Sequence, residues 1–201
     1  MRVTDLFQRA TNPAEVIRSG LATRFVGQTV YFWPVIGSTN DELKWLAEAG
    51  APEGTLAIAD EQRAGRGRLD RTWIAPAGSS LLMSLLFRPA FLAPTQAQQL
   101  TMLCSLAAAD AVAEVTGLQP GLKWPNDLLL SGKKLAGLLT ELGFEGERLA
   151  WGVVGVGLNV NVDLSDQAGK TISLELVGTP KGASEKVRPV CYVCDLSVDS
   201  E

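Results

Sequence analysis

Apolar and polar positions along the chain follow a helical period in some segments and a strand-like texture in others. Residues 38–50 open on Ser-Thr, carry apolar residues three apart and close on a glycine, which is typical of a capped helix. We expect Thr39 to cap this helix together with Glu42, three positions later. The same signals predict helices over residues 5–10, 13–20, 38–50 and 94–117.

Runs rich in β-branched, aromatic and leucine residues predict strands. Two short strands flank the turn signal Ser131-Gly132, and two longer strands are joined by the polar residues 143–148. The longer predicted strands cover residues 29–35, 55–62, 79–87, 134–142 and 149–160. Because helices come early and mostly adjacent strands follow, we expect an α/β (α+β) fold, with a mixed, largely antiparallel sheet flanked by helices.

The pattern fades after about residue 178, which sets the expected domain boundary. Residues 1–178 are expected to form one domain. Residues 179–201 are polar, have no sustained period and contain two prolines and a glycine, so we expect a loosely ordered C-terminal tail.

The 201-residue chain contains no histidine, and its formal net charge is −4. The missing histidine excludes Ser-His-Asp and Cys-His nucleophilic sites and argues against a catalytic zinc. The acidic balance argues against a nucleic-acid binder. Three cysteines (Cys104, Cys191 and Cys194) suit a reducing compartment, and one Cys-x-x-Cys pair is a weak zinc signal. With neither a bilayer-length apolar run nor a signal-peptide pattern, the sequence predicts a cytoplasmic protein without a membrane partner.

Positive charge is concentrated in residues 62–73, "QRAGRGRLDRTW", the arginine loop, which holds four arginines and one acid. Gly65 and Gly67 let backbone N–H groups approach a ligand, and arginine matches carboxylate or phosphate oxygens in a two-pronged fork. No Gly-Lys-Ser/Thr follows, which argues against a P-loop. The loop therefore predicts a small anionic ligand, with a solvated hairpin loop as the alternative.

The stretch "KWPNDLLLSGKKLAG", residues 123–137, contains a second set of candidates. Asn126 can bind a ribose or base edge, and Asp127 can hold Mg²⁺. Side chains alternate along a strand, so one of Lys133 and Lys134 points to the opposite face from the other. If Lys134 points inward, its ammonium needs an anion; the alternative is two surface lysines on a hairpin.

Two further stretches are ambiguous when taken separately. In "GSTNDE", residues 37–42, the polar side chains are either a helix cap or hydrogen-bonding groups of a pocket. In "GVGLNVN", residues 155–161, glycines in a strand indicate the close approach of another backbone or a ligand. Asn159, beyond those glycines, is either a ligand contact or a turn residue.

Taken together, in this order and spacing, these four stretches resemble a biotin–protein ligase (biotin–[carboxylase carrier] ligase) over roughly residues 25–178. The resemblance implies a class II synthetase-like catalytic domain that joins biotin to ATP as biotinyl-5′-AMP. It further implies transfer of biotin to a lysine of a biotin carboxyl carrier protein, with Mg²⁺ accompanying ATP. A homodimer is left open.

The resemblance also implies roles for individual residues. Biotin would be bound by Ser38, Thr39, Asn40, Gln62, Gly65, Arg66, Gly67, Arg68, Lys134 and Gly137. ATP and the adenylate would be bound by Trp73, Asn126, Asp127, Lys134 and Asn159. Lys134, Arg66 and Arg68 would act catalytically on the reacting anions, and Asp127 is the candidate ligand for Mg²⁺.

The sequence departs from the family pattern in its loop and at its ends. Asp70 stands where the family loop usually has glycine, so we expect a stiffer loop. Residues 179–201 do not resemble the family's small C-terminal β domain, and the sequence shows no N-terminal winged helix, so DNA binding is not expected. Two alternatives stay open: a lipoate–protein ligase-like enzyme, and a degenerate, non-catalytic biotin-binding or interaction module.

Overall fold

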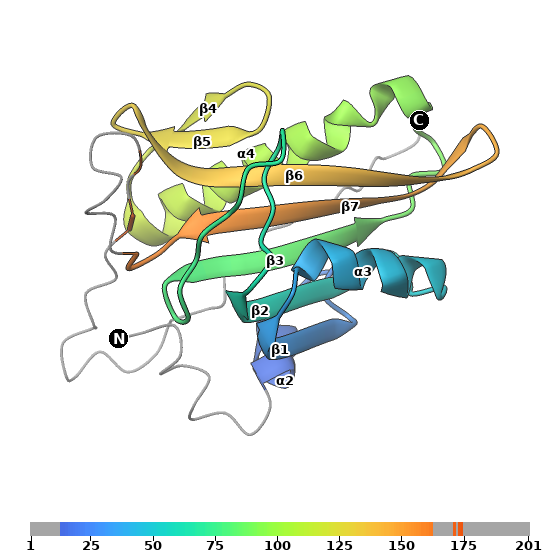
Figure 1. Ribbon diagram of the computed structural model, residues 1–201, viewed down its shortest axis with the longest axis horizontal. Coiled ribbons are helices and arrows are strands. Elements are labelled where there is room, and N and C mark those ends of the chain that lie inside the picture. The colour runs from blue at the N-terminus through green and yellow to red at the C-terminus, as the bar shows by residue number, and fades with distance from the viewer. Residues whose placement is uncertain (1–12, 163–170, 172, 175–201) are drawn as a thin grey trace.

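The structure, a computed structural model, describes residues 13–162, 171 and 173–174. It contains a seven-stranded sheet with helices on both faces (Figure 1). The helices are α2 (Pro13–Gly20), α3 (Thr39–Glu48) and α4 (Gln98–Thr116), with a short 3₁₀ turn at Pro94–Gln96. The strands are β1 (Val30–Ile36), β2 (Leu56–Gln62), β3 (Ser80–Phe87), β4 (Gly121–Lys123), β5 (Asp127–Leu130), β6 (Lys133–Glu145) and β7 (Arg148–Asn159).

The strand order is β1-β2-β3-β7-β6-β5-β4. Only β1 and β2 pair in parallel among these strands, and α3 forms the crossover between them. The other neighbours are antiparallel, and the long β6–β7 hairpin occupies the middle of the sheet. The predicted mixed, largely antiparallel sheet is confirmed.

Strand alternation divides the core into two layers, one on each face of the sheet. On one face, α2 and α4 pack on apolar side chains such as Leu56, Leu85 and Val154. On the opposite face, α3 packs through Leu43 and Ala47. The strand residues that they contact are the chain neighbours of those just named: Ala57, Leu86 and Val153. Because α3 is only ten residues long, it covers one end of its face. The rest of that face lies beneath the connection between β2 and β3 (Figure 1).

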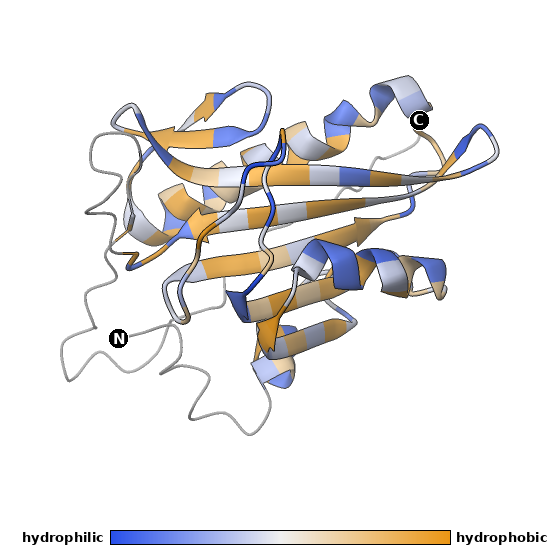
Figure 2. Ribbon diagram, viewed as in Figure 1, coloured by the Kyte–Doolittle hydropathy of each residue, from blue (hydrophilic) through white to orange (hydrophobic). Residues whose placement is uncertain are grey.

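The hydropathy of the residues agrees with this two-layer arrangement of the core. The strands show alternating apolar and polar bands, whereas hydrophilic residues dominate the connection that rises from β2 (Figure 2). Within the described residues, no helix combines the length and the apolar character that crossing a membrane requires.

Most predicted elements agree with the structure to within a few residues. The Ser131-Gly132 turn joins β5 to β6, with positive φ at both positions (52° and 76°), as a tight hairpin requires. The predicted helix over 94–117 is divided: Pro94–Gln96 forms a 3₁₀ turn, and α4 ends before Gly117, whose φ is 73°.

Two differences have local causes. The β6–β7 hairpin extends beyond the predicted strands, because pairing continues through a register shift at Gly143/Phe144 to the turn at Gly146. Strand β4 was not predicted; it is short and exposed, so no apolar pattern marks it. The predicted helix over 5–10 and the tail over 179–201 lie outside the described residues.

Candidate functional site

The arginine loop has a fixed internal fold. Its two sides are joined by hydrogen bonds from Gly67 N–H to Arg71 O (2.6 Å) and from Trp73 N–H to Gly65 O (2.9 Å). A Cβ at Gly65 would lie 2.6 Å from Trp73 O, so this glycine permits the close approach of the two sides. The glycines therefore serve a tight fold as well as ligand access.

The tip of the connection has left-handed backbone, and its far end is held by a hydrogen bond. Leu69 and Asp70 both have φ of 56°, in the left-handed region that favours glycine and that Asp adopts more readily than most residues. Farther on, Gly78 N–H donates to Asp60 Oδ1 at 3.0 Å. Burial raises the pKa of the Asp60 carboxyl, although this hydrogen bond opposes the shift.

A cavity of about 330 Å³ lies between the arginine loop, the start of α3 and strands β5 to β7. It brings together the predicted site residues from segments far apart in the sequence. The predicted residues lining it are Ser38, Thr39, Asn40, Gln62, Arg66, Gly67, Arg68, Trp73, Asn126, Asp127, Lys134, Gly137 and Asn159. Gly65 does not line it but borders an adjacent hollow between the loop, α4 and β6.

Glycines on β6 and β7 form the floor of the cavity. Gly137 pairs with Gly157 across the two strands. A Cβ at Gly157 would lie 2.5 Å from Trp73 Cε2, and one at Gly155 would lie 2.2 Å from Asn40 Oδ1. Gly155 and Gly157 do mark a close approach, but the approaching groups are side chains of Asn40 and Trp73 and not the predicted backbone or ligand.

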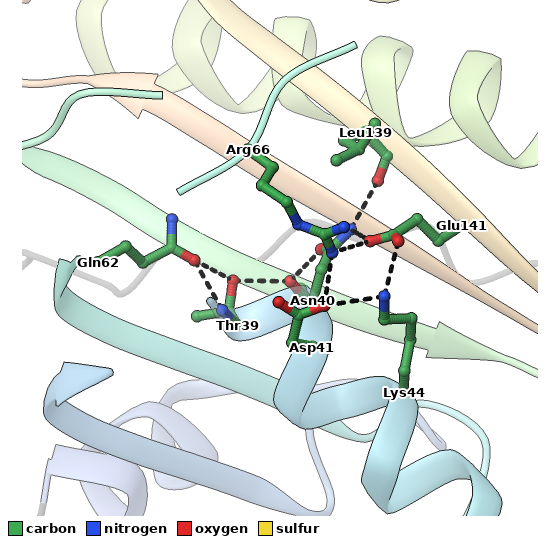
Figure 3. Close-up of polar contacts among 9 residues, drawn as sticks. Thr39, Asn40, Asp41, Lys44, Gln62, Arg66, Leu139 and Glu141 are labelled. Atoms are coloured by element: carbon green, nitrogen blue, oxygen red, sulfur yellow. Dashed lines mark hydrogen bonds and ion pairs between the residues drawn. The ribbon is translucent and has the colours of Figure 1, made fainter. Parts of the chain in front are cut away.

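The start of α3 does not have the predicted cap. Ser38 is the N-cap residue and makes no side-chain cap hydrogen bond, so the capping prediction for Thr39 and Glu42 is wrong. Instead, the N–H and hydroxyl of Thr39 donate to Gln62 Oε1 at 2.7 and 2.9 Å (Figure 3). The Thr39 hydroxyl therefore bonds to a residue of β2 and does not cap its own helix. Gln62 thereby uses its amide oxygen within the protein, which leaves its Nε2 hydrogens as the donors for a ligand.

Ser84 was missed in the sequence. It is fully buried on β3, and its Oγ lies 2.8 Å from Thr39 Oγ1 and 2.6 Å from Asn40 Oδ1. A polar residue within the apolar run "SLLMSLLF" was the available signal.

Glu141, the second missed residue, lies on β6 where three basic or amide groups meet (Figure 3). Its Oε1 accepts from Lys44 Nζ at 2.7 Å. Its Oε2 accepts from Asn40 Nδ2 and Arg66 Nη2, each at 2.8 Å. Burial acts to raise the pKa of the Glu141 carboxyl, but the contacts with Lys44, Asn40 and Arg66 outweigh it and hold that pKa below its ordinary value.

Asp41 completes this cluster. Arg66 Nη2 donates to Asp41 Oδ1 at 2.6 Å, and Lys44 Nζ lies 2.8 Å from the same oxygen. Burial acts to lower the pKa of Lys44, but Asp41 and Glu141 raise it above its ordinary value. The positive charge of Arg66 is therefore balanced by carboxylates of the protein itself.

Arg68 is held much less firmly. Within the described residues, its one side-chain hydrogen bond runs from Nη1 to the neutral Asn126 Oδ1 at 3.2 Å. Asn126 is fixed in turn, because its Nδ2 donates to Leu138 O at 2.8 Å. A hydrogen bond from a guanidinium to a neutral amide is weaker than a pairing with carboxylates, so Arg68 is more easily redirected toward an anion than Arg66.

Lys134 points into the cavity, and Lys133 is exposed, which confirms that the pair divides between the two faces. Lys134 Nζ lies 2.7 Å from Asp127 Oδ1 and 5.6 Å from the centroid of the Trp73 ring. Within the part of the chain that the structure describes, Trp73 Nε1 is buried without a hydrogen-bond partner. Asn159 is buried at the same end of the cavity.

These groups suit a ligand that is anionic at one end and neutral but hydrogen-bonding at the other. Arg68 and Lys134 supply positive charge beside Asn126 and Trp73, whereas Ser38, Thr39, Asn40 and Gln62 supply neutral hydrogen-bonding groups. Among residues 13–162, 171, 173 and 174, no group of three or more His, Cys, Asp or Glu could hold a metal ion.

Comparison with known proteins agrees with this geometry. Residues 32–159 match the biotin/lipoate A/B protein ligase family. The chain is 43% identical over 151 residues to the bifunctional ligase/repressor BirA of Bacillus subtilis, covering 75% of this chain and 46% of that protein. It is 43% identical over 129 residues to the biotin–[acetyl-CoA-carboxylase] ligase of Mycobacterium tuberculosis, covering 62% of this chain and 46% of that protein. The chain thus spans about half the length of these relatives.

Solved structures give the same result for the fold. The biotin protein ligase of Aquifex aeolicus in complex with biotin and ATP superposes with a TM-score of 0.60 at 30% identity, covering 73% of this chain and 59% of that one. The Leishmania major biotin protein ligase in complex with biotinyl-5-AMP also gives 0.60, at 28% identity, covering 72% and 62%.

Proposed function

Because the chain belongs to the biotin/lipoate A/B protein ligase family, we propose that it joins the biotin carboxylate to the α-phosphate of ATP, forming biotinyl-5′-AMP and pyrophosphate, and then transfers biotin to a lysine. The names of the relatives and the ligands of the two solved structures support this activity. The main support for this activity is one cavity, which is lined by predicted residues from α3, the arginine loop and β5 to β7.

The anionic end of the cavity fits the first chemical step. A carboxylate and a polyphosphate repel each other, so bringing them together requires fixed positive charge in a site that excludes water. Arg68 is held by one hydrogen bond to a neutral amide, and Lys134 lies near the start of β6 beside Trp73. Lys134 would contact the carboxylate and the α-phosphate, while Arg68 would close over the phosphates with the arginine loop.

The neutral end fits the ureido ring of biotin. The Nε2 of Gln62 and the hydroxyl of Ser38 are donors that can reach a ureido oxygen, since Gln62 Oε1 is already occupied by Thr39. Asn40 offers its Oδ1 as an acceptor for a ureido N–H, because its Nδ2 is occupied by Leu139 O and Glu141. Gly137 would provide space along the floor.

Trp73, Asn126 and Asn159 would bind the adenosine side of ATP. The donor set fits a Mg²⁺ ion carried by ATP, because Asp127 is one carboxylate and Mg²⁺ at nucleotide sites keeps waters and phosphate oxygens as its other ligands. When bound, the ion would neutralise phosphate charge. Asp127 would have to release Lys134 to reach it, which would free the ammonium for the substrate.

The proposed acceptor is a lysine of a biotin carboxyl carrier protein, supported by the acetyl-CoA-carboxylase ligase names of two relatives. A cytoplasmic location and the homodimer option stay predictions from the sequence. So does the division into a catalytic domain over 1–178 and a tail.

Lipoate is the competing substrate, because the family description includes lipoate ligases. The dithiolane ring of lipoate has no N–H or carbonyl group. Burying it against Ser38, Asn40 and Gln62 would leave these polar side chains without ligand partners, which is costly. The polar end of the cavity therefore favours biotin.

Exchange of labelled pyrophosphate into ATP tests the proposal on the whole chain. We expect exchange with biotin and none with lipoate, and loss of exchange in a Lys134→Ala variant. Biotin binding without exchange would instead favour the non-catalytic binding module, and exchange with lipoate alone would favour the lipoate ligase.

A further inference from the structure

Glu141 joins three separate segments of the site, although none of the sequence signals marks it. Lys44 and Asn40 come from α3, and Arg66 comes from the arginine loop (Figure 3). The Glu141 side chain is 21% exposed, and both of its oxygens accept hydrogen bonds from these groups. A half-buried carboxylate whose two oxygens both accept hydrogen bonds holds the helix and the strand in a fixed arrangement.

The first consequence concerns the amide of Asn40. Its Nδ2 donates to Leu139 O at 3.2 Å and to Glu141 Oε2 at 2.8 Å, which uses both amide hydrogens. A flipped amide would put Asn40 Oδ1 against those two oxygens, where oxygens repel. The Glu141 carboxylate thus fixes the orientation of the Asn40 amide. In this orientation Oδ1 lies beside Ser84 Oγ and over Gly155.

The second consequence concerns the arginine loop. Arg66 Nη2 is shared between Glu141 Oε2 at 2.8 Å and Asp41 Oδ1 at 2.6 Å. Two carboxylates hold Arg66, whereas Arg68 has one contact with a neutral amide. The first half of the loop is therefore fastened to α3 and β6, and the half that carries Arg68 is free to respond to an anion.

We propose that Glu141 is a positioning residue with two effects: it orients Asn40 so that Oδ1 accepts an N–H of the bound ligand, and it fastens Arg66 so that the arginine loop closes from an anchored side. The first effect rests on the proposed function, because it takes the ureido ring of biotin as the ligand. The second effect is a property of the ligand-free protein.

The test compares Glu141→Gln with Glu145→Gln in the whole chain. Glu145 is an acidic residue on the same strand, but it lies at the far hairpin end and forms an exposed ion pair with Arg148. Biotin affinity by calorimetry should fall about tenfold in Glu141→Gln, because the neutral amide no longer fixes the orientation of Asn40 and a buried ureido N–H is left without its acceptor, and should be unchanged in Glu145→Gln. The KM for biotin should rise while the KM for ATP stays within about twofold, a split that general loss of structure would not produce.

Hydrogen exchange in the ligand-free protein measures the second effect. Amides of residues 63–73 should exchange faster in Glu141→Gln than in the wild type or in Glu145→Gln. Equal exchange together with unchanged biotin affinity would overturn the proposal. Failure of the wild-type chain to bind biotin would instead remove the proposed function and the role of Asn40, while the exchange result would still decide the anchoring of the loop.

A double-mutant cycle separates action through Asn40 from an independent effect. If Glu141 acts through Asn40, Glu141→Gln should add little loss of biotin affinity in an Asn40→Ala background. Additive losses would overturn the positioning role. If Glu141→Gln does not fold, Asn40→Asp replaces it: this variant keeps Oδ1 but lacks the donor hydrogens, so biotin affinity should fall, and unchanged affinity would overturn the proposal.

Discussion

The glycine at position 155 is where a single methyl group should do most damage to the neutral end of the cavity. A Cβ added there would lie 2.2 Å from Asn40 Oδ1, 2.9 Å from Asn40 Cγ and 3.2 Å from Asn40 Nδ2. Real Cβ contacts are essentially never shorter than 3.0 Å, so Asn40 or the strand must move. Asn40 is held by Leu139 O, Glu141 and Ser84, and moving it by an ångström breaks these hydrogen bonds.

The expected size of the effect follows from two contributions. Overpacking a buried site costs about 1–3 kcal/mol in the free energy of unfolding, which for a chain of this size corresponds to roughly 2–12 °C in Tm. Loss of the Asn40 acceptor should weaken biotin binding, since leaving a buried ureido N–H without its partner costs about 1–3 kcal/mol, or roughly 5- to 150-fold in affinity. Gly155→Ala should therefore lose both stability and affinity.

Thermal unfolding and biotin calorimetry on Gly155→Ala and Gly121→Ala measure both contributions. Gly121 is also a strand glycine, but the nearest atom to its added Cβ is Leu129 O at 4.0 Å, so this variant should behave as the wild type. A Gly155→Ala protein that matched Gly121→Ala in Tm and in biotin affinity would refute the assignment of Asn40 to the ligand.

Three other perturbations test the charged groups. Lys134→Ala should be the substitution that most slows adenylate formation, since the ammonium matters most in the transition state; single-turnover rates near wild type would remove Lys134 from the mechanism. Arg68→Ala should leave biotin affinity within a few-fold but weaken retention of the adenylate by roughly 1.5–3 kcal/mol, measured from its dissociation rate, and equal weakening of both ligands would count against loop closure. The lowered pKa of Glu141 means that its stabilising contribution is present above the ordinary carboxyl pKa and is lost as pH falls through its folded-state pKa. Acid titration of Tm should therefore show a smaller loss in Glu141→Gln than in wild type, and identical acid profiles would refute this linkage.

The local parts of this architecture were predictable because their causes are local. The Ser131-Gly132 turn requires positive φ at both positions, and Ser-Gly between two apolar strands indicates this in the sequence. The division of Lys133 and Lys134 follows from strand alternation alone. Helix α2 begins at Pro13 and ends at Gly20, where proline and glycine predict its ends.

The parts that were missed depend on tertiary contacts. Glu141 and Asn40 are separated by 101 positions, and only the sheet order places β6 beside the start of α3. Thr39 had the sequence of a cap, yet Gln62, 23 positions away, takes its hydroxyl. Neither the period of the chain nor its capping motifs contains information about such pairings, because several strand orders satisfy the same pattern.

We propose that this chain transfers biotin to a carrier lysine, and mass spectrometry of the carrier detects that transfer directly. A purified biotin carboxyl carrier domain is incubated with the whole chain, ATP, Mg²⁺ and biotin, alongside a reaction with the Lys134→Ala variant. We predict the mass of one biotinyl group on a single lysine of the carrier with the wild-type chain, and an unmodified carrier with the variant. An unmodified carrier in the wild-type reaction, from a chain that binds biotin in calorimetry, would contradict the account and leave a biotin-binding module.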